Sequence, residues 1–73
     1  MSDVTIHIDE TLDMTALLAM QHELEKMQGV QRIDARENRP HLMVVTYDHL
    51  QTHSGEILSE FSEHGYHAEL IGF

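Results

Sequence analysis

The sequence predicts one α+β domain, residues 1–73, in which two helices cover one face of a four-stranded antiparallel sheet. Two observations predict this fold class. The chain has 73 residues, 41% of them hydrophobic and none of them cysteine, so it must fold around one small apolar core without a disulfide. Segments with alternating apolar residues and segments with apolar residues at helical spacing follow one another in the order β-α-β-β-α-β.

The N-terminal part of the chain predicts a strand and then a helix. Residues 3–9 alternate between apolar and polar side chains, as a half-buried strand does. In residues 13–28 the period changes, and one helical stripe of apolar side chains is formed by Leu17, Met20, Leu24 and Met27. Asp13 is suited to be the N-cap of this helix, and Gly29 is suited to end it.

Two strands and a second helix follow. Residues 30–36 and 41–47 are predicted strands, separated by a turn that contains asparagine and proline. The second helix is expected to run to about His64, with Thr52 or Ser54 as its N-cap. Its buried stripe consists of Ile57, Leu58 and Phe61.

Gly65 is expected to end the second helix, and residues 67–71 are expected to form the last strand. The connections between these segments are short throughout. The complete order is that of the ferredoxin-like βαββαβ sandwich.

The charge of the chain limits its partners. Thirteen acidic residues against four basic ones give a formal net charge of -9. Such a surface repels nucleic acid and anionic membranes, and it attracts cations or a protein with a basic face. No apolar run approaches the roughly 20 residues that span a bilayer, and the N-terminus lacks the features of a signal peptide. We therefore expect a cytoplasmic protein without nucleic-acid binding or membrane insertion.

Three stretches resemble one known family. They are GVQRIDA (residues 29–35), VVTYD (44–48) and EHGYHAELI (63–71). Together they resemble the heavy-metal-associated domain, the fold of copper chaperones, mercury-transport proteins and the N-terminal modules of metal-pumping ATPases. The similarity covers nearly the whole chain. It implies a metal-binding domain that docks on a metal transporter.

The chain departs from this family at the metal-binding motif. The family binds soft metals through a Cys-x-x-Cys loop between the first strand and the first helix. The register anchored on Gly29 places that motif on residues 13–16, with Asp13 and Ala16 at the thiol positions. A second register would place the thiols at Ala16 and Ala19, but it shortens the helix by three residues. Neither register retains a thiol, so thiolate chemistry is excluded.

Seven histidines offer another set of metal ligands. One candidate site combines Asp13 with His64 and His67, which this fold places at one pole. A second candidate lies on the open face of the sheet, where His7 and His67 are accompanied by Asp9 and Glu69. Imidazole and carboxylate suit zinc, nickel or cupric copper. The alternative for both clusters is an ordinary solvated polar surface.

Two functional hypotheses follow. In the first, the chain is a non-enzymatic, metallochaperone-like protein that binds or transfers a borderline metal ion through histidine and aspartate. In the second, it is a metal-free interaction or regulatory module that dimerises through the open sheet face, where Leu42, Val44 and Ile71 add apolar area. An enzyme is not expected, because nucleophile motifs and glycine-rich phosphate loops are absent. Residues 9–15 also lack the arginine of an acylphosphatase loop.

Overall fold

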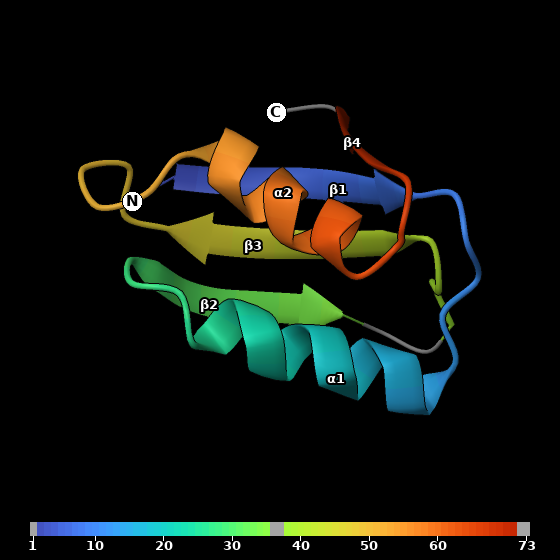
Figure 1. Cartoon of the computed structure of the whole chain (residues 1–73). Helices are drawn as coiled ribbons and strands as arrows, with labels where there is room; N and C mark the ends of the chain where they lie inside the picture. The colour runs from blue at the N-terminus through green and yellow to red at the C-terminus, as the bar shows by residue number, and fades with distance from the viewer. Residues whose placement is uncertain (1, 36–37, 72–73) are drawn as a thin grey trace.

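The computed structural model describes residues 2–35 and 38–71 and confirms the predicted fold class. Two helices pack on one face of an antiparallel four-stranded sheet with strand order β2-β3-β1-β4 (Figure 1). The elements are β1 (Ser2–Ile8), α1 (Met14–Glu25), β2 (Val30–Ala35), β3 (Leu42–Tyr47), α2 (Ser54–Glu63) and β4 (Ala68–Ile71). The expected end of the second strand at residue 36 and the beginning of the turn at residue 37 lie outside the described residues.

The core lies between the sheet and the helices. Most residues of the predicted helical stripes are buried, and the sheet contributes the inward side chains of β1 and β3: Val4, Ile6, Ile8, Met43 and Val45. Met27 follows the end of α1 and packs against this core, as does Leu58 on α2. Leu12, in the loop before α1, is 3% exposed and joins the core. Hydrophobic periodicity did not predict Leu12, because a loop has no period.

The beginning of α1 matches the prediction, and its end does not. Asp13 is the N-cap, and its Oδ1 accepts a hydrogen bond from the Ala16 N–H at 2.8 Å. The helix ends at Glu25, three residues before the predicted end at residue 28. There the N–H of Lys26 bonds to the carbonyl of Glu23 at 3.3 Å, the tighter spacing that commonly finishes a helix.

The N-cap of α2 is His53, so the prediction of Thr52 or Ser54 was wrong. The Thr52 side chain is 2% exposed, and its hydroxyl donates a hydrogen bond to Oε2 of Glu56 at 2.8 Å. Because this hydroxyl bonds to the Glu56 side chain, it does not cap the helix, and the backbone N–H groups of the first helical turn bond to other partners. The N–H of Glu56 bonds instead to the carbonyl of His53 at 3.0 Å.

Two glycines adopt positive φ for different reasons. Gly65 (φ 85°) follows α2, where its N–H bonds to the carbonyl of Ser62 and the next N–H, of Tyr66, bonds to that of Phe61. This pair of bonds is the Schellman ending of a helix. Gly29 (φ 96°) lies between α1 and β2, and a Cβ there would be 2.8 Å from Cβ of Gln51. Nothing lies within 4 Å of a Cβ at Gly65.

This difference predicts unequal costs for two alanine substitutions. Gly65→Ala should lower the free energy of unfolding by about 1–2 kcal/mol, the cost of a left-handed backbone with a side chain. Gly29→Ala should cost roughly 1–3 kcal/mol more, because Gln51 and the turn before α2 must also move. Urea midpoints of the two variants measure the comparison. Equal losses of stability would mean that the turn around Gln51 yields without cost.

Candidate metal centre

The two helices cover one face of the sheet (Figure 1). The opposite face carries polar side chains of β1 and β4. Because Ile6 and Ile8 point into the core, the alternation of β1 places His7 on the open face. The pairing of β1 with β4 puts Glu69 directly opposite His7. Asp9 follows β1, and its N–H donates to the carbonyl of His67 at 2.8 Å. The backbone therefore brings His7, Asp9 and Glu69 to one place.

The side chains of these three residues converge. Nδ1 of His7 lies 3.6 Å from Oδ1 of Asp9 and 4.0 Å from Oε1 of Glu69. One ligand atom from each residue lies within 4.8 Å of the others. The side chains are 37%, 65% and 70% exposed, in the order His7, Asp9 and Glu69. We call this group the open-face triad.

Nδ1 of His7 is the most unusual atom of the triad. It is shielded from solvent, yet within the described parts of the chain it has no hydrogen-bond partner. Its two carboxylate neighbours stand slightly beyond hydrogen-bond distance. A zinc ion with nitrogen and oxygen ligands at about 2.0–2.2 Å holds them about 3.4 Å apart in a tetrahedron. The His7–Asp9 separation is close to that value, and the exposed Glu69 side chain has to move by less than about 1.5 Å.

His41 supports the ring of His7. The two rings are stacked, with centroids 6.0 Å apart and planes 17° from parallel. His41 Nδ1 donates to the carbonyl of Ile8 at 2.9 Å, because a carbonyl can only accept. Its Nε2 then accepts from the hydroxyl of Thr11 at 3.3 Å. Both nitrogens of His41 therefore have hydrogen-bond partners, and its ring stacks on that of His7.

The other predicted cluster is distributed over separate contacts. Asp13 caps α1, and Nε2 of His64 lies 3.7 Å from Oε2 of Glu60. His67 bonds through Nδ1 to Oε2 of Glu10 at 2.7 Å. Among the described residues, the group of three whose ligand atoms meet is the open-face triad, and Asp13, His64 and His67 do not form such a group. A metal site at these three residues stays a prediction.

Glu10 and His67 form a contact that the sequence did not predict. The Glu10 carboxylate accepts two hydrogen bonds from His67, one from Nδ1 and one from the backbone N–H at 2.8 Å. The side-chain hydrogen bond is the main reason why the pKa of Glu10 falls below its ordinary value of 4.5. The same bond raises the pKa of His67 above its ordinary value of 6.5. The pair joins the loop before α1 to the beginning of β4.

Comparison with known proteins adds a result at the level of the fold. No protein-family model matches the chain, and no curated protein matches its sequence. Oxidized MerP from Ralstonia metallidurans CH34 is similar in structure, with a TM-score of 0.86 and 18% identity over 97% of each chain. This chain has the MerP fold.

Two further solved structures agree with this assignment. A copper binding domain from HMA7, a P-type ATPase, has a TM-score of 0.88 and 15% identity, over 99% of this chain and 96% of that one. The apo copper chaperone of Enterococcus hirae has a TM-score of 0.81 and 19% identity, over 93% of this chain and 98% of that one. The heavy-metal-associated type of fold implied by the resemblance is therefore confirmed. None of the helices in the described residues is long and apolar enough to cross a membrane.

The Glu10–His67 pair predicts a pH dependence of stability. Because folding raises the pKa of His67, its contact with Glu10 adds stability that is fully present below pH 6.5. This stability is lost as the pH rises through the pKa of His67 in the folded protein. Because folding lowers the pKa of Glu10, the same contact adds stability that is fully present above pH 4.5. This stability is lost as the pH falls through the pKa of Glu10 in the folded protein. The contact should therefore stabilise the fold most between pH 4.5 and 6.5.

Glu10→Gln tests this expectation. The loss of stability relative to the wild type should be largest near pH 5.5 and smaller at pH 3 and pH 8, measured by urea unfolding at each pH. Glu63→Gln, which removes an exposed carboxylate of α2, is the control. A loss for Glu10→Gln that does not vary with pH would show that the side chain acts through packing alone.

Proposed function

We propose that this chain is a non-enzymatic metal-handling domain that binds one zinc, nickel or cupric copper ion through the open-face triad. The observation that carries the proposal is the convergence of an imidazole and two carboxylates within 4.8 Å. The shielded Nδ1 of His7, without a hydrogen-bond partner in the described chain, supports it. A nitrogen and two oxygens are a donor set for a borderline divalent cation.

The surroundings of the triad favour exchange of the ion over permanent storage. Asp9 and Glu69 are mostly exposed, so water completes the coordination and a competing ligand has access. The net charge of -9 attracts cations and favours docking on a partner with a basic face, such as a metal transporter. A domain with the same fold comes from a P-type ATPase, which supports this choice of partner.

The site at Asp13, His64 and His67 is the second candidate, and it would need a larger rearrangement. The Glu10 bond occupies Nδ1 of His67 and the N-cap bond occupies Oδ1 of Asp13, which leaves Nε2 and Oδ2 of these side chains for a metal ion. Among the described residues, however, the ligand atoms of Asp13, His64 and His67 do not form a converging group. The ligand atoms of the triad already lie within 4.8 Å of one another.

Titration calorimetry with zinc, nickel and cupric copper tests the proposal. At least one ion should bind with a dissociation constant tighter than about 100 μM, and His7→Gln should weaken it about tenfold or more. His22→Gln is the matched control, because His22 is an exposed histidine on α1. His64→Gln and Asp13→Asn should leave the affinity unchanged.

Two results would contradict the open-face triad. The first is the absence of any binding tighter than about 100 μM, which is the range of scattered surface histidines. The second is binding that survives His7→Gln and Glu69→Gln but is lost in His64→Gln or Asp13→Asn. That result would move the metal to the pole beside α1.

A further inference from the structure

His67 lies beside the open-face triad, on the same face of the sheet. Ala68 packs against the core, so the alternation of β4 places its two neighbours, His67 and Glu69, on the opposite face. The N–H of Asp9 donates to the carbonyl of His67 at 2.8 Å, so this pair continues the pairing of β1 with β4. In that pairing His7 lies opposite Glu69. The four residues therefore form two adjacent cross-strand pairs on the open face.

The spacing of a β-sheet allows these four side chains to share one ion. Residues directly opposite each other have Cβ atoms about 4.5–5.5 Å apart, and diagonal neighbours about 7–8 Å apart. His7 and His67 are the diagonal pair. Nδ1 of His7 is the ring nitrogen nearer the backbone, whereas Nε2 of His67 is at the far end of its ring, so His67 can reach an ion held beside His7. His67 also borders a surface pocket together with Asp9 and Glu69.

Glu10 holds the ring of His67 in the form that binds a metal ion through Nε2. Its Oε2 accepts a hydrogen bond from Nδ1 at 2.7 Å, and its Oε1 accepts one from the backbone N–H of His67 at 2.8 Å. Because a carboxylate can only accept, Nδ1 carries the proton, and the neutral ring has its free electron pair on Nε2. A metal-binding histidine usually donates its other N–H to such an oxygen, which fixes the tautomer and the orientation of the ring.

The ring of His67 is free to turn toward the triad. Its side chain is 80% exposed, so a rotation removes no core packing. In the structure its Nε2 lies outside the group of ligand atoms that meet within 4.8 Å. An ion therefore has to draw the ring toward Asp9 and Glu69. The Glu10 side chain, in the loop before α1, can follow this movement because it is 34% exposed.

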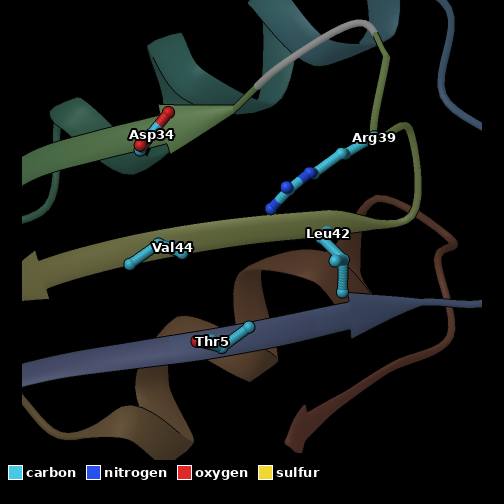
Figure 2. A pocket seen from close by; sticks show the side chains of 5 residues that line it. All are labelled: Thr5, Asp34, Arg39, Leu42 and Val44. Atoms are coloured by element: carbon cyan, nitrogen blue, oxygen red, sulfur yellow. The ribbon is translucent and has the colours of Figure 1, made fainter.

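The other half of the open face is unsuited to a cation. Figure 2 shows the side chain of Arg39 extending from the loop before β3 over the sheet, between Asp34 on β2 and Leu42 on β3. These three residues border the pocket on that side. A guanidinium is always charged in proteins and repels a metal ion. The charges of the face therefore favour a cation at its β1–β4 end, where the carboxylates of the triad lie.

We propose that His67 is the outer ligand of the open-face site, where it binds zinc through Nε2, and that Glu10 is its positioning residue. The inference rests on the proposed function, because it requires an ion held by the triad. With His67 the site has two imidazole nitrogens and two carboxylate oxygens, and four such ligands suit tetrahedral zinc. His67 occupies the position that the triad alone leaves to water. Its exposed ring gives way to a competing ligand when the ion is transferred.

Calorimetric titration with zinc tests this assignment. His67→Gln should raise the dissociation constant about tenfold or more, and Glu10→Gln about fivefold or more. In the His67→Gln background, Glu10→Gln should change the constant by less than about twofold, because Glu10 acts through His67. His22→Gln on α1 and Glu63→Gln on α2 make the same chemical changes at exposed positions and are the controls.

Nitrogen NMR of the imidazole rings gives a readout that a general loss of stability would not change. In the zinc-loaded protein, the chemical shifts of His67 should report a metal-bound Nε2 and a protonated Nδ1. Without metal, Glu10→Gln should raise the fraction of the tautomer protonated at Nε2, because an amide is a weaker acceptor than a carboxylate. An unchanged tautomer in Glu10→Gln would overturn the positioning role.

The outcomes separate this inference from the proposed function. Zinc binding that requires His7 but is unchanged in His67→Gln would overturn the inference and leave the proposed function intact. Zinc binding that is lost in His67→Gln together with His64→Gln or Asp13→Asn would also overturn it, because His67 would then belong to the pole beside α1. Without any zinc binding tighter than about 100 μM the inference fails, whereas binding of nickel or copper that depends on His7 would still support the proposed function.

Discussion

The two-residue period of β1 is the constraint on which the structure depends. Ile6 and Ile8 are fully buried beneath the helices, so His7 between them must point to the other face. A register slip of one residue would bury the imidazole and expose both isoleucines, at a cost of several kcal/mol in lost apolar burial. β1 also pairs with both β3 and β4, so its orientation fixes what stands beside His7 on each side.

The pole of the molecule at the beginning of α1 is organised differently from what the family resemblance implies. The two positions where that resemblance places thiols, Asp13 and Ala16, are joined to each other by the capping hydrogen bond. In the loop before them, Glu10 is bonded to His67, just before β4, and Thr11 is bonded to His41, just before β3. These carboxylate and hydroxyl groups already have partners. Among the described residues, the group of potential ligand atoms that converges lies instead on the sheet face, at the ends of β1 and β4.

The sequence was sufficient for the features that depend on local periodicity. The order of the elements, the Asp13 cap and the glycine ending of α2 all follow from patterns within a few residues, and all were confirmed. The side of β1 that carries His7 and Asp9 follows from the same alternation. The proximity of Glu69 also follows, once the fold sets β4 antiparallel to β1.

The remaining features depend on where loops run, and no local pattern encodes that. Glu10 and His67 were expected at the same pole, but their pairing requires the path of the loop before α1 to be known. The burial of Leu12 depends on the same path. Thr52 has a residue type suited to an N-cap, but its hydroxyl donates to Glu56, a partner that the residue type alone does not indicate.

The bonds of His41 have a consequence for the end of β1. Ile8 donates its N–H to the carbonyl of His41 and receives the Nδ1 hydrogen of the same residue at its own carbonyl. The imidazole N–H therefore takes the place of a backbone N–H between β1 and β3, one residue before β3 begins. A strand end usually frays because its last carbonyl has only water as a partner. Here the His41 side chain adds one hydrogen bond at the end of β1, so the position from which the chain continues to Asp9 is fixed.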